Sequence, residues 1–156
     1  MTENRITNEN ITDLKENEVF VFGSNENGFH AAGAAKLAKD KFGAIEGKGF
    51  GPAGQSFAIP TKDWSMNQIP YDALECFVMR FIGYALHNPD KKFLVTQIGC
   101  GLAGFKPEEV APFFKLAEHI SNISLPKCFW DVIEDNTIEE MIKNMSINYG
   151  REKNEF

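Results

Sequence analysis

Short apolar runs rich in β-branched and aromatic residues alternate along this chain with segments of helical periodicity. The most regular segment is residues 69–89, where apolar side chains recur at spacings of three and four and share one helical face. The alternation predicts an α/β domain in which helices cover both faces of a largely parallel sheet. Strands are expected at 18–22, 56–60, 92–98 and 127–133, and helices at 31–42, 69–89, 107–120 and 137–145, with a glycine-rich loop at 43–55.

Length and hydropathy favour one domain without a membrane span. The chain has 156 residues, enough for a single domain with a substantial core. We expect that domain at 11–145, between polar segments at 1–10 and 146–156 that fray. No apolar run approaches the roughly 18 residues that cross a bilayer. The amino terminus lacks the pattern of a signal peptide, which favours a cytoplasmic protein with no membrane association.

Charge and cysteine content exclude further classes of protein. With 16 basic and 22 acidic residues the net charge is −6, whereas general binding to nucleic acid needs a basic surface. Cys76, Cys100 and Cys128 are an odd number at wide spacing. This pattern favours three reduced thiols over a disulfide framework or a zinc site. No metal or other cofactor is expected.

A glycine-rich turn, GCGLAGF (99–105), follows the third expected strand. Its three glycines remove side chains, so backbone N–H groups can converge on an anion at the start of the following helix. A tight structural corner also needs glycine, and Cys100 as a nucleophile would need a nearby base such as His30. An anion site is the better interpretation of the turn. The sequence has no G-x-x-x-x-G-K-[ST], which excludes an ordinary P-loop.

The loop after the first expected strand, GSNENGFHAAGAA (23–35), is a second candidate. Asn25 carries amide donors and a carbonyl acceptor suited to sugar hydroxyls. Gly28 and Gly33 flank His30 and two alanines, and together they leave an open surface that a ligand can approach. A turn followed by a tightly packed helix would explain the same residues. The spacing is not G-x-G-x-x-G, so the dinucleotide fingerprint is absent.

Lys62 and Asp63 directly follow the second expected strand. Residues at strand ends are often merely solvated, which would leave both without a role. Ligands of open α/β sheets bind beyond the carboxyl ends of the strands. There, Lys62 would act as a nucleophile or phosphate partner and Asp63 as a base. Trp64 would stack on a base or cap the core, and one of Phe129 and Trp130 would border an adenine pocket.

Together these loops resemble those of the macrodomain family, whose members bind ADP-ribose. Asn25 with NGFHAAGAA matches the family's early asparagine and small-residue loop, and IGCGLAGF matches the loop that wraps the diphosphate. The segments AGAAKLAKDKFGAI, IPTKD and IGCGLAGF are most similar to the branch that contains the terminal ADP-ribose protein glycohydrolase, over about residues 17–133. The resemblance implies a three-layer α/β/α fold around a mixed, largely parallel sheet.

The resemblance also implies a ligand and a chemistry. The partner would be ADP-ribose or a related NAD-derived nucleotide, free or attached to a macromolecule. In that branch a lysine that corresponds to Lys62 attacks the anomeric carbon, and an aspartate after G-C-G-L transfers a proton. Ala103 occupies the position of that aspartate, which leaves Asp63 as the acid to consider. The implied ligand-binding residues are Gly23, Ser24, Asn25, Gly28, His30 and Gly33, and then Gly99, Cys100, Gly101, Leu102, Ala103, Gly104 and Phe105.

Three alternatives to an ADP-ribosyl hydrolase stay open. The chain would be a binder of the same ligand without catalysis, or a scavenger of a nucleotide signal. It would otherwise be an unrelated α/β nucleotide-sensing domain that shares only the glycine-rich loops.

Overall fold

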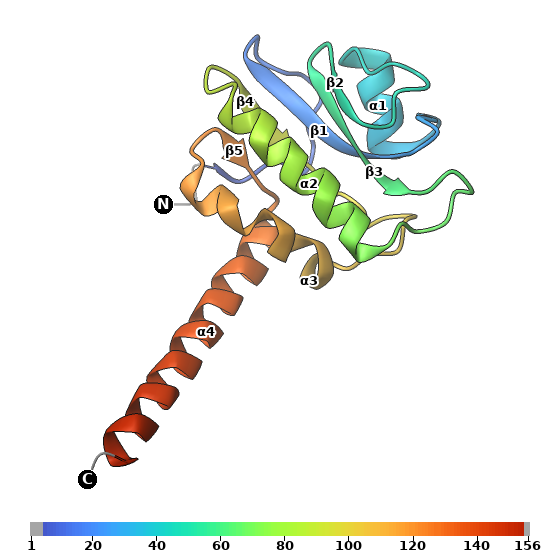
Figure 1. Cartoon of the computed structure of the whole chain (residues 1–156). Helices are drawn as coiled ribbons and strands as arrows, with labels where there is room; N and C mark the ends of the chain where they lie inside the picture. The colour runs from blue at the N-terminus through green and yellow to red at the C-terminus, as the bar shows by residue number, and fades with distance from the viewer. Residues whose placement is uncertain (1–4, 155–156) are drawn as a thin grey trace.

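The computed structural model describes residues 5–154 and shows an α/β fold (Figure 1). Its five-stranded sheet has the order β2-β3-β1-β4-β5. β1 pairs in parallel with β3 and β4, and β4 pairs in parallel with β5, whereas the edge strand β2 is antiparallel to β3. The sheet is therefore mixed and largely parallel. The strands are β1 (Glu18–Asn25), β2 (Gly51–Ala53), β3 (Ser56–Lys62), β4 (Lys92–Val95) and β5 (Ile123–Ser124).

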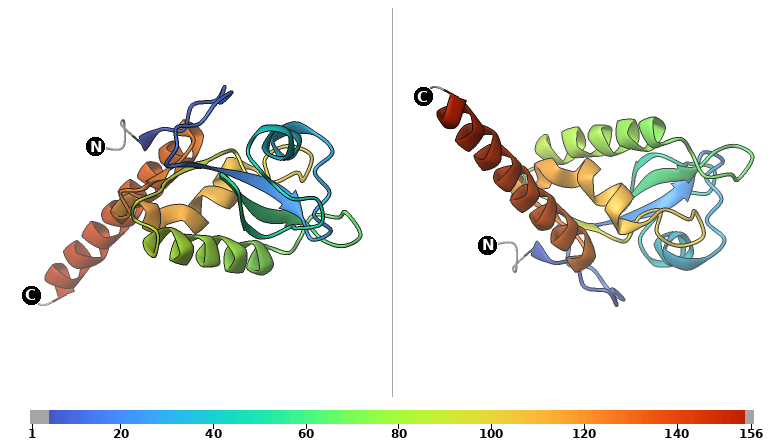
Figure 2. Two further views of the ribbon diagram at one scale, coloured as in Figure 1. Left: turned by 90° about the horizontal axis from the view of Figure 1, so that it is seen from above. Right: turned by 90° about the horizontal axis from the view of Figure 1, so that it is seen from below.

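Helices lie on both faces of the sheet, as predicted (Figure 2). On one face lies α1 (Gly33–Lys41), and on the other lie α2 (Tyr71–Leu86), α3 (Pro107–Val110) and the 3-10 helix η2 (Ala111–His119). The last helix, α4 (Lys127–Asn154), begins beside η2 and extends away from the domain (Figure 1). No helix in the described part of the chain is long and apolar enough to cross a membrane.

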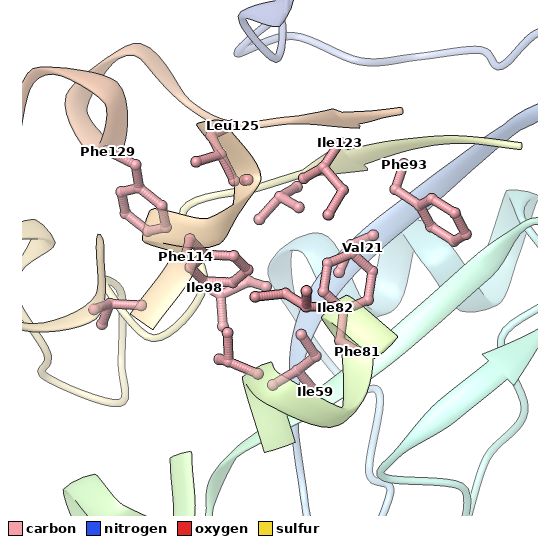
Figure 3. Packing of buried hydrophobic residues seen from close by; sticks show 14 of the residues in the cluster. Val21, Ile59, Phe81, Ile82, Phe93, Ile98, Phe114, Ile123, Leu125 and Phe129 are labelled. Atoms are coloured by element: carbon pink, nitrogen blue, oxygen red, sulfur yellow. The ribbon is translucent and has the colours of Figure 1, made fainter. Parts of the chain in front are cut away.

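The core forms two clusters because β1 is covered on both faces. Phe20 and Phe22 belong to the cluster under α1, whereas Val19 and Val21 belong to the larger cluster under α2 and η2. Successive residues of a strand point to opposite faces, so a run of buried residues in β1 supplies both clusters. Figure 3 shows Val21 among the side chains of the larger cluster. The central strand is thereby fixed, and its carboxyl end is held in place for the site described below.

The predicted strand at 127–133 is wrong, because these residues form the first turns of α4. Phe129, Trp130 and Ile133 are each at most 2% exposed. Their spacing places them on one helical face, whereas a strand would turn Phe129 and Trp130 to opposite faces. This segment therefore forms a helix despite its β propensity, because the helix buries these three side chains on one face. Both aromatic rings are in the core, so neither borders an adenine pocket.

Other element predictions also differ from the structure. The predicted helix 107–120 divides into α3 and η2 near Pro112, which has no backbone N–H to continue the α-helical ladder. The loop at 43–55 contains the edge strand β2, and the predicted helix 137–145 lies within α4. The polar segment expected to fray from residue 146 continues α4 to residue 154. Residues 1–4 and 155–156 lie outside the described part of the chain.

Arg5 fixes the amino-terminal segment, which was expected to fray, to the domain. Its guanidinium donates hydrogen bonds of 2.8–2.9 Å to the carbonyls of Ala117, Ile120 and Ile123. It also lies 5.1 Å from the ring centroid of Trp130, whose indole N–H donates to the Arg5 carbonyl. Carbonyls at the end of a helix carry partial negative charge and favour a cation there. The segment at 5–7 is therefore part of the fold.

Replacing Arg5 with alanine is expected to destabilise the protein by about 2 kcal/mol, because several hydrogen bonds from a charged donor are lost together. The melting temperature should then fall by about 4–8 °C. Thermal unfolding followed by circular dichroism measures the change. Lys36→Ala is the control, since Lys36 forms an exposed pair with Asp40 that contributes little. Equal melting temperatures for the two variants would contradict the proposed anchoring.

Candidate functional site

A cleft of about 450 Å³ opens at the carboxyl ends of β1, β3 and β4. Ligands of open α/β sheets bind at this edge. The walls are the loop after β1 together with the start of α1, the loop after β3, and the glycine-rich turn after β4. The sheet order brings these three strands side by side, so loops far apart in the sequence meet at one place.

Predicted site residues divide into those that line this cleft and those that do not. The lining residues that were predicted are Gly23, Ser24, Asn25, Gly33, Lys62, Gly99, Gly101, Leu102 and Ala103. The predicted residues outside the lining are Gly28, His30, Asp63, Cys100, Gly104 and Phe105. The lining residues that sequence analysis missed are Phe29, Ala31, Ala32, Ala34, Ala35, Thr61, Met66, Thr96, Gln97 and Ile98.

The turn after β4 leaves consecutive backbone donors free. Gly99 begins it at φ 78°, and a Cβ there would lie 2.9 Å from the ring of Phe105, so the position needs glycine. The carbonyls of Gly99, Gly101 and Ala103 accept hydrogen bonds of 2.9–3.0 Å from groups of the protein. Within residues 5–154, by contrast, the N–H groups of residues 101–103 have no acceptor. Successive free N–H groups of this kind make an anion-binding concavity.

The first turn of α1 adds donors of the same kind to the cleft. Residues 31–35, which are alanines and Gly33, all line it. Ala32 is the N-cap residue and provides no side-chain cap, so the first N–H groups of the helix have no intrahelical partner. The small side chains let a ligand approach a helix end that carries partial positive charge. The cleft is therefore rich in hydrogen-bond donors from two backbone segments.

The start of α3, by contrast, is not open to a ligand. The Oε1 atom of Glu109 accepts a hydrogen bond of 2.9 Å from the Lys106 N–H and so caps this short helix. No residue of α3 lines the cleft, so the structure gives no support for an anion at the start of this helix. The free donors belong to the turn itself and to α1.

Lys62 gives the cleft a positive charge. Lys62 is the last residue of β3. All residues that line the cleft lie in the described part of the chain, and Lys62 is the one among them with a charged side chain. None of the ion pairs found in residues 5–154 includes it. No carboxylate lines the cleft. The arrangement suits an anionic ligand and offers no carboxylic acid or base for proton transfer.

Asp63 has a structural role in the turn after β3 and not the predicted role of a base. Its Oδ1 atom accepts hydrogen bonds from the N–H groups of Ser65 at 2.9 Å and Asn67 at 3.0 Å. This turn holds Met66 at φ 63° and brings it to the wall of the cleft. Asp63 therefore shapes the rim beside Lys62 without reaching the cleft.

Asn25 and Gly28 also shape a loop. The Asn25 amide both donates to the Phe29 carbonyl and accepts from the Phe29 N–H, each at 2.9 Å. The amide oxygen and the amide NH2 of Asn25 each make one hydrogen bond within the protein, and each can make one more. Gly28 packs against the backbone of Gly47, where a Cβ would lie 2.3 Å from the carbonyl carbon. Both residues hold the loop that precedes α1.

The Cys100 thiol faces away from the cleft and packs against the core. It donates a weak hydrogen bond of 3.5 Å to the Ile98 carbonyl. Burial, with smaller effects of Cys128 and Glu108, raises its pKa to about 11. His30 pairs with Ser24 and not with this thiol. The turn therefore has no activated cysteine nucleophile.

Cys100 should react slowly with iodoacetamide at pH 8, because a pKa about 3 above the pH leaves roughly one thiol in a thousand ionised. The exposed Cys76 should be modified first. Mass spectrometry of peptides from a time course measures both rates. Modification of Cys100 as fast as that of Cys76 would contradict this assignment.

A second hollow of about 490 Å³ adjoins the cleft and shares Gly33, Ala34, Thr96 and Gln97 with it. Its other walls come from residues 7–11 of the amino-terminal segment, from α1 and β1, and from Pro126. The segment that Arg5 fixes is thus a wall of this hollow.

The fold and site define an α/β protein with a mixed, largely parallel sheet and a donor-rich cleft at the carboxyl ends of its strands. Comparisons with protein-family models, with curated proteins and with solved structures find no match to this chain.

Proposed function

We propose that this protein binds ADP-ribose or a closely related NAD-derived nucleotide in the cleft, as a macrodomain-like module. The observation that carries the proposal is the turn at 99–105, where the carbonyls of Gly99, Gly101 and Ala103 accept hydrogen bonds and the N–H groups of residues 101–103 have no acceptor within residues 5–154. These N–H groups belong to exposed or half-buried residues of the cleft wall, so a ligand that enters the cleft can supply their acceptors. The oxygens of a diphosphate supply several at once.

Charge supports the same class of ligand. Lys62 lies in the wall of the cleft, and no carboxylate opposes an anion there. The net charge of −6 belongs to the chain as a whole, whereas backbone N–H groups and a helix end set the local potential. An anionic ligand is therefore compatible with an acidic protein.

Size supports a ligand with two parts. The cleft and the second hollow, at about 450 and 490 Å³, each lie within the roughly 300–1,000 Å³ range of small-molecule sites. They meet at the start of α1 and at Thr96 and Gln97. A diphosphate held at the turn would allow a sugar to extend towards Lys62 and a nucleoside to extend into the second hollow.

Titration calorimetry with ADP-ribose tests this proposal, and absence of binding at millimolar ligand would refute it. Lys62→Ala is expected to weaken binding about tenfold, because a close cation at a partly buried site contributes about 1.4 kcal/mol. Lys106→Ala, which removes an exposed lysine outside the lining, should leave the affinity unchanged. Equal affinity of both variants would show that Lys62 does not contact the ligand.

Hydrolysis of an ADP-ribosyl bond is a second candidate function, favoured by the position of Lys62 in the cleft. Lys62 would act as a nucleophile or electrostatic stabiliser. Two observations oppose hydrolysis. Ala103 occupies the position of the expected acid, and the Ala103 carbonyl accepts a hydrogen bond from Gln68. Asp63, the other candidate acid, does not line the cleft. Turnover of an ADP-ribosylated peptide by wild type but not by Lys62→Ala would establish hydrolysis. Absence of turnover would leave the binding function alone, whereas equal rates in the two proteins would mean that Lys62 has no part in hydrolysis.

A further inference from the structure

Ser24 and His30 form a buried pair beside the cleft. Ser24 is 5% exposed and lines the cleft, whereas His30 is 1% exposed and does not. The His30 Nε2 atom lies 3.0 Å from the Ser24 Oγ atom, and the ring packs edge-on against Phe22. A polar pair in such a position is expensive to bury unless its hydrogen bonds are made.

The second ring nitrogen indicates which tautomer His30 adopts. Its Nδ1 atom is buried and has no hydrogen-bond partner in the described part of the chain. Burial is the largest effect on the pKa of His30 and lowers it. Lys39 also lowers this pKa, whereas Glu46 and the Lys48 backbone raise it by less than burial lowers it, so the ring is neutral at pH 7. A neutral imidazole has one N–H, and buried N–H groups are left without acceptors more rarely than buried acceptors are left without donors. We therefore assign the hydrogen to Nε2.

We propose that His30 is a positioning residue that makes the Ser24 hydroxyl a hydrogen-bond donor to an anionic oxygen of the ligand. When Nε2–H donates to Oγ, the hydroxyl hydrogen of Ser24 is free, and Oγ has no other partner within residues 5–154. The inference rests on the proposed function, since it assigns a contact within the same cleft.

The other two hydroxyls of the cleft wall are already used. Thr61 donates to the Ser24 carbonyl at 3.1 Å, and Thr96 donates to the Val21 carbonyl at 2.8 Å. Of the three hydroxyl groups in the cleft wall, that of Ser24 is therefore the one that can donate a hydrogen bond to a ligand. It adds to the donors of the turn and of α1 and favours acceptor-only groups such as phosphate.

Binding measurements test the pair as one unit. Ser24→Ala should weaken ADP-ribose binding about tenfold or more, the usual loss for a hydrogen bond to a charged group. His30→Phe keeps a ring but lacks the donor and should lose as much, whereas His30→Gln offers an amide N–H and should bind within about threefold of wild type. The double variant Ser24→Ala/His30→Phe should be no weaker than Ser24→Ala alone. Wild-type affinity in Ser24→Ala would overturn the proposal.

Nitrogen NMR of the unliganded wild type with ¹⁵N-labelled histidine gives an independent test. We expect the hydrogen of His30 on Nε2, and a hydrogen on Nδ1 would overturn the proposal even if ADP-ribose binds. If ADP-ribose does not bind to the wild type, the proposed function fails, and inorganic pyrophosphate becomes the probe. Pyrophosphate binding about tenfold weaker in Ser24→Ala than in wild type would then support the role of the hydroxyl. Equal binding, or none, would overturn it.

Discussion

Replacing Phe81 with alanine is expected to lower the free energy of unfolding by about 3–5 kcal/mol, the usual loss for a fully buried phenylalanine. Phe81 is 0% exposed on α2, and its ring centroid lies 5.1 Å from that of Phe57. It also lies 5.5 Å from the ring centroid of Phe93 and 6.3 Å from that of Phe114, and both of these rings are labelled in Figure 3. These rings come from β3, β4 and η2. One side chain therefore joins α2 to the sheet and to η2, and its loss would leave a cavity between them.

The melting temperature of Phe81→Ala should fall by roughly 6–20 °C, which calorimetry or circular dichroism can measure. Met79→Ala is a matched control, because Met79 lies on the same helix but is 43% exposed. That variant should change stability by no more than about 0.5 kcal/mol. Similar losses in the two variants would mean that Phe81 is not central to the core.

The fold could be predicted where local periodicity and burial agree. Residues 69–89 repeat apolar side chains at helical spacing, and α2 (Tyr71–Leu86) buries that face. Prediction failed at 127–133, where a short run of apolar and aromatic residues fits a strand as well as a helix. Only the packing of Phe129, Trp130 and Ile133 on one side decides between the two, and packing depends on segments distant in the sequence.

The sequence predicted where the site lies better than it predicted what each residue does there. Loops after parallel strands meet at one edge of a sheet, which is why Lys62 and the turn at 99–105 line the same cleft. The roles of Asp63 and Asn25 depend instead on hydrogen bonds to their own loops. Carboxylate and amide side chains can stabilise a turn or bind a ligand. The amino-acid sequence alone therefore did not show which of these two roles Asp63 and Asn25 have.

Replacing Gly101 with aspartate is expected to weaken ADP-ribose binding by more than about 100-fold. Gly101 lies in the wall of the cleft, and a Cβ built there meets no atom within 4 Å, so the side chain would enter open space beside the free N–H groups. A carboxylate about 5 Å from a phosphate charge, at an effective dielectric constant of about 20, is repelled by about 3 kcal/mol. The carboxylate would also accept hydrogen bonds from the N–H groups that the diphosphate needs.

Gly101→Asn separates charge from bulk, because asparagine has the shape of aspartate without its charge. We expect it to weaken binding by several-fold only, since a neutral amide obstructs the cleft but repels no phosphate. Calorimetric titration of both variants at low and at high salt measures the difference. The gap between them should narrow as salt screens the repulsion. Equal affinity for Gly101→Asp and Gly101→Asn would mean that no anionic group of the ligand lies at the turn, and the diphosphate assignment would then fail.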